Sequence, residues 1–376
     1  MITFDFETYM KKPTKEVAVQ NLIEKLKQDE LNDWYESLEE TYSIKNLANN
    51  IRDNFDVFLV IGIGGSILGS KGIIEALTPY INSKKIIYVG NNLSSEYINE
   101  VIEYIKDKKV FANVISKSGD TIEVNIAFEL FYPYLEKENI LITTSGGKLY
   151  ETSLKEGLKV LPFPKNVGGR YSVFKISSLL PISVAKIDII ELLKGAEKAK
   201  TDIKNIKKYL EIRQSFYEEG YSVEFINVYE PKLASLIECI EQILAETQGK
   251  ENKGLLPVSV VNTGKLHSLG QYIEEGKNIG FETTILVENT NDIFVKSYNK
   301  NLNQINTLAA TSVAKSHFIK NRYTSLIKLD KLNEYNIGYL IMFYMMISSL
   351  GSYLLDVNYY DQPGVSKYKE ILSQNL

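Results

Sequence analysis

Apolar residues follow two different spacings along this chain, and each spacing predicts a different element. In the first half, short apolar runs of strand length alternate with longer segments in which apolar residues recur at helical intervals. The short runs predict strands over residues 57–61, 86–89, 110–115 and 140–143. The longer segments predict helices over residues 67–78, 95–107 and 121–137. Strands that alternate with helices are typical of a parallel sheet with crossover helices.

The same alternation returns in the second half, after a charged stretch at residues 198–208. It predicts strands over 223–228, 256–261 and 281–287, and helices over 232–247 and 306–320. We therefore expect an α/β protein with two doubly wound parallel-sheet domains, in which ligands bind at the carboxyl ends of the strands. The predicted division is an N-terminal helical extension (1–45), a first domain (46–195), a second domain (200–355) and a C-terminal helix (356–376).

One segment, residues 335–355, is apolar and about long enough to cross a bilayer. It contains several Tyr, Ser and Gly residues, so we predict a buried helix in a core or a subunit interface, and no membrane attachment. The first ten residues carry acidic side chains where a secretory signal needs basic ones.

Composition and charge narrow the classes of function. The chain has 376 residues, of which 44% are apolar and 24% charged, and its formal net charge is −4. This balance gives no general attraction to nucleic acid or to an acidic membrane, so an anionic ligand needs a local site. The single cysteine, Cys239, excludes an internal disulfide and a cysteine-rich zinc site. It also indicates a reducing compartment, and we predict a cytoplasmic protein.

A glycine-rich stretch, IGIGGSILGSKG at residues 61–72, follows the first predicted strand. It is not a dinucleotide fingerprint, because Ile67 stands where the third glycine is required. It is not a P-loop either, because Ser70 stands where that motif needs lysine. Glycines at a turn from strand to helix let the backbone approach an anion closely. A tight turn that binds nothing explains this stretch equally well.

A second loop, SKSGDTIE at residues 116–123, follows the predicted strand 110–115. The hydroxyls of Ser116, Ser118 and Thr121 can donate to phosphate oxygens, as can backbone amides at a helix start. A hydroxyl-rich helix cap is the alternative, and Asp120 opposes an anion unless it points away. Together the two loops match the pattern of domains that bind sugar phosphates.

Three further stretches identify a family. With the two loops, residues 166–185, 245–276 and 361–372 resemble the glucose-6-phosphate isomerase family, in the same order from about residue 57 to the C-terminus. The segments around Arg170 and His267 are specific to that family. The resemblance implies two sugar-isomerase (SIS) domains, each a flavodoxin-like α/β/α sandwich. It also implies a glycolytic and gluconeogenic enzyme that interconverts glucose 6-phosphate and fructose 6-phosphate through a cis-enediolate, without a metal, nucleotide or redox cofactor.

The resemblance also assigns roles to residues. It implies that Glu246 moves the proton between C1 and C2, with Gln242 one helical turn earlier on the same face. It implies that His267 and Lys369 open the sugar ring, and that His267 comes from the neighbouring subunit of a homodimer. Lys367 lies on a different helix face from Lys369.

The remaining roles concern charge and phosphate. The resemblance implies that the guanidinium of Arg170 stabilises the enediolate, and that Gln362 contacts the substrate. We expect Gly65 and Ser66 to line the site. The phosphate is then held by the second loop, through Ser116, Lys117, Ser118 and Thr121. Taken without the family, Glu246, His267 and Lys369 would each be ordinary surface or core residues.

Two departures from the family pattern stand out. Asp120 replaces a hydroxyl found in many members, and residues 293–305 form a shorter stretch than expected. Three functions stay open at this stage: the isomerase, a non-catalytic sugar-phosphate sensor on the same domains, and an isomerase that uses mannose 6-phosphate or an amino-sugar phosphate. The presence of Glu246, His267 and Lys369 together favours the first.

Overall fold

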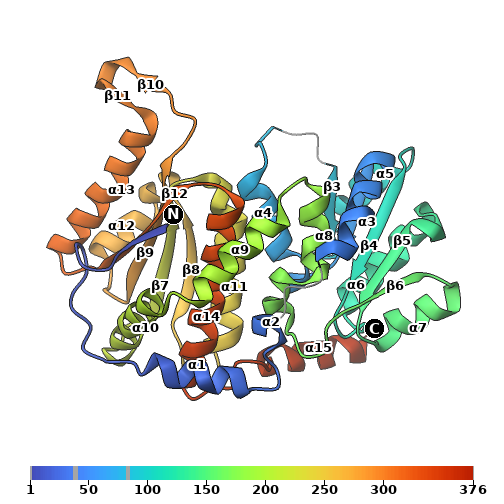
Figure 1. The fold of residues 1–376 in the computed structure, drawn as a ribbon, viewed down its shortest axis with the longest axis horizontal. Coiled ribbons are helices and arrows are strands. Elements are labelled where there is room, and N and C mark those ends of the chain that lie inside the picture. The colour runs from blue at the N-terminus through green and yellow to red at the C-terminus, as the bar shows by residue number, and fades with distance from the viewer. Residues whose placement is uncertain (1, 37–40, 82–84, 376) are drawn as a thin grey trace. The chain divides into compact units, whose positions relative to one another are not determined.

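The chain folds into two compact units, seen in a computed structural model that describes residues 2–36, 41–81 and 85–375. One unit comprises residues 29–193 and is called the glycine-loop unit. The other comprises residues 1–28 and 194–376 and is called the Glu246 unit. The chain passes from the first to the second within helix α9 (Ile189–Lys200). Figure 1 labels the elements of both units.

The glycine-loop unit is built on a five-stranded parallel sheet in the order β3-β2-β4-β5-β6. Its strands are β2 (Val57–Ile61), β3 (Ile86–Val89), β4 (Val110–Ile115), β5 (Ile140–Thr144) and β6 (Lys159–Pro162). This order is that of flavodoxin-like folds. Every residue of β2 and β4 is buried, which explains why the sequence shows continuous apolar runs there and no alternation.

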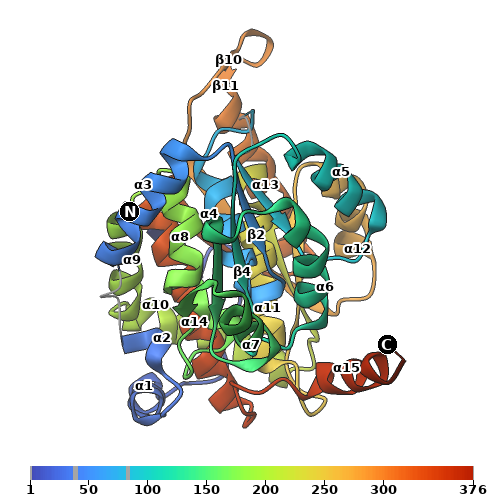
Figure 2. The same cartoon turned by 90° about the vertical axis from the view of Figure 1, so that its right-hand side faces the viewer.

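Helices cover both faces of this sheet, as Figure 2 shows for its central strands. The helices are α2 (Asp33–Glu36), α3 (Thr41–Asn54), α4 (Leu68–Leu77), α5 (Ser95–Ile105), α6 (Ile122–Phe131), α7 (Gly147–Glu156) and α8 (Ile176–Val184). Apolar residues of α5 and α6 pack with alternate residues of β2 and β4 in one continuous core. Helices α3 and α4 pack against α8. The predicted α/β/α sandwich is therefore confirmed here.

The Glu246 unit has a second five-stranded sheet in the order β1-β12-β9-β7-β8. Its strands are β1 (Ile2–Asp5), β7 (Val223–Val228), β8 (Leu256–Val261), β9 (Gly280–Asn289) and β12 (Thr324–Lys331). All pairs are parallel except the pair of β1 with β12. The helices are α1 (Val19–Gln28), α10 (Ile203–Glu218), α11 (Ala234–Gln248), α12 (Leu269–Glu275), α13 (Leu302–Ile319), α14 (Glu334–Leu354) and α15 (Pro363–Asn375).

Helix α14 is the apolar segment that could have crossed a membrane. It is long and apolar enough to do so, but 89% of its most apolar window is buried inside the protein. It packs against α10 and α11. The prediction of a buried core helix is confirmed, and its Tyr and Ser residues find partners there, as in the hydrogen bond from Ser348 Oγ to the carbonyl of Ile243, 3.0 Å long.

The structure corrects several expected elements. The N-terminal extension over 1–45 is not wholly helical, because residues 2–5 form the edge strand β1; residues 1 and 37–40 lie outside the described part. A four-residue edge strand is too short to give a clear alternation. Helix α6 ends at Phe131 and not at 137, since Pro133 lies in the 3₁₀ turn that follows it. Strands β6 and β12 were not predicted, and residues 293–305 contain the small hairpin of β10 (Phe294–Val295) and β11 (Lys300–Asn301).

Candidate active site

The glycine-rich loop at the end of β2 packs directly against the segment that carries Arg170. A Cβ atom placed on Gly65 would lie 2.3 Å from the carbonyl carbon of Gly169 and 2.4 Å from the amide nitrogen of Arg170. The hydroxyl of Ser172 donates to the carbonyl of Gly169 (2.8 Å) and to that of Gly65 (3.3 Å). Only glycine fits at position 65, and the two segments form one backbone assembly. Ser66, also predicted, lies in the same turn and is buried.

The hydroxyl-rich loop follows β4, the parallel neighbour of β2, so both loops lie at the carboxyl edge of one sheet. The buried hydroxyl of Ser116 accepts a bond from the amide of Gly119 (3.1 Å) and hydrogen-bonds the hydroxyl of Thr121 (2.9 Å). Ser118 is exposed, and its hydroxyl accepts from the amide of Asp120 (3.2 Å). Helix α6 begins directly after Thr121 without a side-chain cap, which suits an anion at its amino end.

Asp120, whose charge opposes a bound anion, is turned toward another helix. Its Oδ1 accepts a hydrogen bond from the amide of Lys148, in the first turn of α7, at 2.9 Å. Gly119 and Gly147 have positive φ angles (+76° and +70°) and let the two loops approach this closely. The carboxylate therefore stabilises the start of α7, which is a favourable place for negative charge.

Two cationic side chains of this unit lie close enough to influence each other. Arg170 is only 3% exposed, and Lys117 is half-buried in the hydroxyl-rich loop. Burial lowers the pKa of Lys117, and the positive charge of Arg170 lowers it further. An anion bound beside them would be attracted by both charges. The structure thus brings together the predicted Gly65, Ser66, Lys117 and Arg170 within one unit.

In the Glu246 unit, two predicted glutamines surround the predicted base. Gln242 Nε2 donates to Oε1 of Glu246 at 2.6 Å, one helical turn away on α11. Gln362 Nε2, which precedes α15, donates to the other oxygen of the same carboxylate. Each oxygen of Glu246 therefore has one amide donor, which fixes the orientation of the carboxylate. The adjacency of Gln242 and Glu246 is confirmed, and the contact with Gln362 joins segments 116 residues apart.

Lys250, which the sequence did not single out, joins the end of α11 to the segment that precedes α15. The side chain of Lys250 is buried, and its Nζ donates to Asp361 Oδ1 at 2.8 Å and to the carbonyl of Asn358. Lys250 lies just beyond α11, and Asp361 directly precedes Gln362. Nothing in the sequence distinguishes this lysine from its partly exposed neighbour Lys253, because the burial of Lys250 arises only when the two segments meet.

His267 lies away from Glu246 within one chain. Helix α11 joins the parallel strands β7 and β8, so Glu246, near its last turn, lies at the amino end of β8. His267 follows the carboxyl end of β8 in the turn Gly264–His267 and is exposed. Six strand residues separate the two ends, which is roughly 20 Å at about 3.3 Å per residue. One copy of the chain does not bring the two residues together.

The two lysines considered on the C-terminal helix are surface residues, whereas the second histidine of the chain is buried. Lys369 lies on the exposed helix α15, and its ammonium makes no hydrogen bond or ion pair with the described residues. Lys367 pairs with Glu370 at 2.9 Å, as a solvated surface lysine does. The second histidine, His317, is buried and bonded to Glu282 and Glu274, so its role is structural.

Other chemistries find little support in the described residues. No group of three or more His, Cys, Asp or Glu side chains among them is arranged to hold a metal ion. Burial, with a smaller contribution from the charge of Glu246, raises the pKa of the Cys239 thiol to about 12, which disfavours the thiolate that a nucleophilic cysteine requires.

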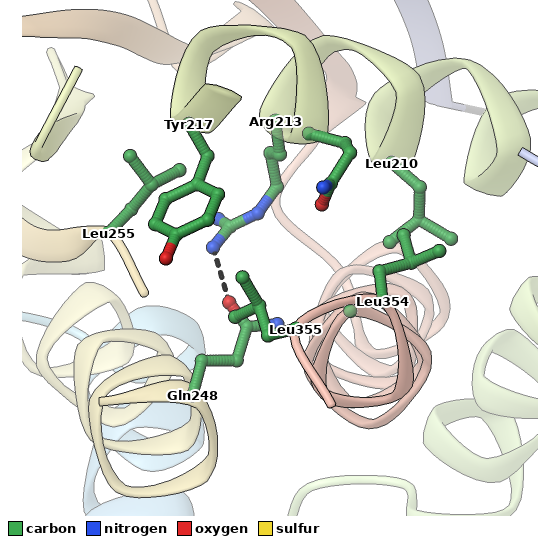
Figure 3. Close-up of a pocket in the computed structure, with 9 residues that line it drawn as sticks. Leu210, Arg213, Tyr217, Gln248, Leu255, Leu354 and Leu355 are labelled. Atoms are coloured by element: carbon green, nitrogen blue, oxygen red, sulfur yellow. Dashed lines mark hydrogen bonds between the residues drawn. The ribbon is translucent and has the colours of Figure 1, made fainter. Parts of the chain in front are cut away.

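A small cavity elsewhere in the Glu246 unit contains none of the predicted site residues (Figure 3). It lies among α10, the end of α11 and the end of α14, with leucines on its walls. The guanidinium of Arg213 donates to Gln248 Oε1 there at 2.7 Å and is paired with the buried carboxylate of Glu224. Because Arg213 is already bonded to both, we assign this cavity no part in catalysis.

Comparison with known proteins gives one consistent result. The profile of the family described as phosphoglucose isomerase matches residues 30–267. A glucose-6-phosphate isomerase from Clostridium tetani is 41% identical over 88% of this chain and 82% of its own length. The corresponding enzyme of Staphylococcus saprophyticus is 36% identical with the same coverage. Among solved structures, a glucose-6-phosphate isomerase from Chlamydia trachomatis shares the fold at 23% identity, with a TM-score of 0.76 over 89% of this chain and 72% of its own.

Proposed function

The chain belongs to the phosphoglucose isomerase family, and from this premise we propose its reaction, the reversible conversion of glucose 6-phosphate into fructose 6-phosphate. This is a step of glycolysis and gluconeogenesis, and we place it in the cytoplasm. The observation that carries the proposal is the carboxylate of Glu246, held by one glutamine amide on each oxygen.

The glycine-loop unit holds the phosphate in this proposal. The exposed hydroxyl of Ser118, the hydroxyl of Thr121, the ammonium of Lys117 and the backbone at the start of α6 bind the phosphate oxygens. Ser116 is buried, and we expect it to act mainly by fixing the loop. Gly65 and Ser66 line the site through their backbone.

The Glu246 unit moves the proton. In the open-chain sugar, Glu246 removes the proton from the carbon next to the carbonyl, and the electron pair moves onto the carbonyl oxygen to give a cis-enediolate. Returning the same proton to the other carbon, while the hydroxyl proton passes from one enediolate oxygen to the other, completes the isomerisation, so no oxidant or reductant is needed. The amides of Gln242 and Gln362 aim the carboxylate, and the permanent charge of Arg170 stabilises the enediolate oxygen.

Ring opening requires a second copy of the chain in this proposal. His267 exchanges a proton with the ring oxygen, and Lys369 assists. Because His267 lies at the opposite end of β8 from Glu246, it serves the Glu246 of a partner subunit in a homodimer. The exposed aromatic side chains of Tyr272, Phe294 and Tyr298, in the elements that follow His267, offer apolar surface for that contact.

Turnover of fructose 6-phosphate is the first test. Glucose 6-phosphate is detected by coupling to glucose-6-phosphate dehydrogenase and NADP. Glu246→Gln should lower kcat by about 10²–10⁴-fold, with little change in binding. The matched control is Glu238→Gln, an exposed acid on the same helix that should leave kcat unchanged. Near-normal turnover by Glu246→Gln would refute the assigned base. No turnover by the wild-type protein, with sugar-phosphate binding retained, would identify a sensor.

Mixing inactive variants tests the dimer. Glu246→Gln and His267→Gln should each be inactive alone. Exchange of subunits at equal amounts should restore about a quarter of wild-type activity, because half of the dimers are mixed and each mixed dimer has one intact site. Absence of recovery, although mixed dimers form, would contradict the assignment of His267 to the partner.

A further inference from the structure

The only tryptophan of the chain, Trp34, lies in α2 and is 1% exposed. Its ring stacks on Tyr171, with the ring centroids 4.8 Å apart and the planes inclined by 21°. Tyr171 is equally buried and belongs to the turn Gly169–Phe174. The contact joins a segment to which the sequence assigned no role to the turn that carries Arg170.

The same tyrosine ring contacts Arg170. The guanidinium carbon of Arg170 lies 5.8 Å from the centroid of the Tyr171 ring, within the range of a cation–π interaction. Trp34, Tyr171 and Arg170 are therefore linked ring to ring and ring to cation. An arginine side chain has many rotamers, and a guanidinium held over a ring loses part of that freedom before substrate arrives.

A second contact fixes the same two segments. Lys175, which is 3% exposed, donates through Nζ to the backbone carbonyl of Asp33 at 2.7 Å. Asp33 precedes Trp34, and Lys175 follows the turn of Tyr171, so the two contacts join the same stretches of chain. The indole nitrogen of Trp34 has no hydrogen-bond partner among the described residues. Ring stacking, and not a hydrogen bond, is thus the contact that Trp34 makes with Tyr171.

We propose that Trp34 is a positioning residue for the isomerase reaction, which holds the guanidinium of Arg170 in place through the ring of Tyr171. The inference rests on the proposed function, in which Arg170 stabilises the enediolate. Stabilisation of a developing charge is effective only when the donor is fixed before the charge forms. Loss of Trp34 should therefore reduce the rate of the chemical step more than it weakens substrate binding.

Steady-state kinetics of Trp34 variants test this. Trp34→Leu should lower kcat about tenfold with KM changed by less than about threefold, as expected for a small displacement of a catalytic group. Trp34→Phe keeps a ring without the indole nitrogen and should recover most of kcat. The control is Phe111→Leu, which removes a buried ring near the amino end of β4, away from the loops.

The control separates positioning from stability. Both leucine variants are brought to the same fraction folded, measured by urea unfolding. If Trp34→Leu then loses no more kcat than Phe111→Leu, the ring only fills the core and the proposal is refuted. Equal loss in Trp34→Phe and Trp34→Leu also refutes it. Absence of isomerase activity in the wild-type protein would instead contradict the proposed function.

Tryptophan fluorescence gives a readout that does not depend on turnover. Emission reports Trp34 alone, since the chain has one tryptophan. Glucitol 6-phosphate, which has the phosphate but no carbonyl to isomerise, is the probe, and calorimetry measures its binding independently. We expect a saturable change in emission with the same midpoint as the calorimetric titration, and a smaller change in Arg170→Gln at saturation. Unchanged emission with bound probe would contradict the link from Trp34 to Arg170.

Discussion

Backbone packing holds Gly65 against the Arg170 segment in the glycine-loop unit, whereas side-chain hydrogen bonds hold the carboxylate of Glu246 in the other unit. At Gly65 the chain touches Gly169 and Arg170 so closely that a methyl group does not fit. At Glu246 the carboxylate is oriented by two amides from side chains, one of them 116 residues away. The first arrangement tolerates no added atom, and the second depends on long side chains remaining in one rotamer.

This difference fits the two tasks proposed for the units. A phosphate has the same charge and shape throughout the reaction, so a rigid backbone cradle suits it. The base must serve two carbons in turn, and a carboxylate on a side chain can shift slightly between them. The two regions should therefore respond differently to substitution, since rigid packing fails abruptly and a hydrogen-bonded arrangement fails by degrees.

Among the substitutions that test this difference, Gly65→Ala should have the largest effect. Its Cβ would lie 2.3 Å from the backbone of Gly169, so that segment must move and displace Arg170. We expect kcat/KM to fall about 100-fold, as for a displacement of about 1 Å at a reacting group. Gly168→Ala is the control, because its Cβ would meet only Tyr171 Cδ2, at 3.8 Å. Comparable losses in both variants, measured in the coupled assay, would show that close packing at Gly65 is not the cause.

The same difference explains what the sequence could predict. A glycine motif is a short contiguous stretch of sequence, so the loop at residues 61–72 and its position after a strand were predicted correctly. The relation of Gln242 to Glu246 follows from helical spacing and was also predicted. The contact of Glu246 with Gln362 was not, because it depends on how segments distant in the chain meet.

The prediction of secondary structure from the sequence met the same limit. Strands buried on both faces, such as β2 and β4, have continuous apolar runs and were predicted with correct bounds. The edge strands β1 and β6 are only four residues long and partly exposed, so they carry no clear pattern. The direction of Asp120 toward α7 also required the structure, since its partner is the amide of Lys148.

Lys250→Met should have an intermediate effect and tests the hydrogen bonds around Glu246. It removes the bonds from Lys250 to Asp361 and Asn358, so the hydrogen bond from Gln362 to Glu246 loses the support of these neighbouring contacts. We expect kcat to fall about tenfold, because Glu246 loses the fixed position of one amide donor. Lys253→Met is the matched control, since Lys253 is a nearby lysine with partners in the same segments, but it is more exposed and makes a weaker, solvated ion pair.

An abrupt loss would break the comparison. If Lys250→Met lowers activity as much as Gly65→Ala, the Glu246 unit is as sensitive to substitution as the glycine-loop unit. The proposed contrast between rigid packing and adaptable hydrogen bonds would then be wrong. Equal activity of Lys250→Met and Lys253→Met would show instead that the ion pair with Asp361 does not position Gln362. Urea unfolding of both variants separates a change in position from a loss of folded protein.

His317 provides the smallest expected effect on activity, because its bonds lie in the Glu246 unit but do not reach Glu246. Burial by itself lowers the pKa of His317. The hydrogen bond and charge of Glu282 and the charge of Glu274 outweigh burial and the nearby Arg322, so the net shift is upward. A histidine whose pKa is higher in the folded state stabilises the fold fully below its ordinary pKa, and this contribution is lost as the pH rises through the folded value.

The free energy of unfolding of the wild-type protein should therefore decline across that interval relative to His317→Gln, measured by urea unfolding at several pH values. Below the ordinary histidine pKa, His317→Gln should cost about 1–3 kcal/mol through the loss of hydrogen bonds to charged groups. Its kcat for the folded fraction should stay within about twofold of wild type, since side-chain bonds affect turnover only where they hold a group that acts on substrate. A parallel pH dependence of the two unfolding free energies would show that His317 does not carry the stabilising proton. A large loss of kcat would show that the hydrogen bonds of His317 also support the active site.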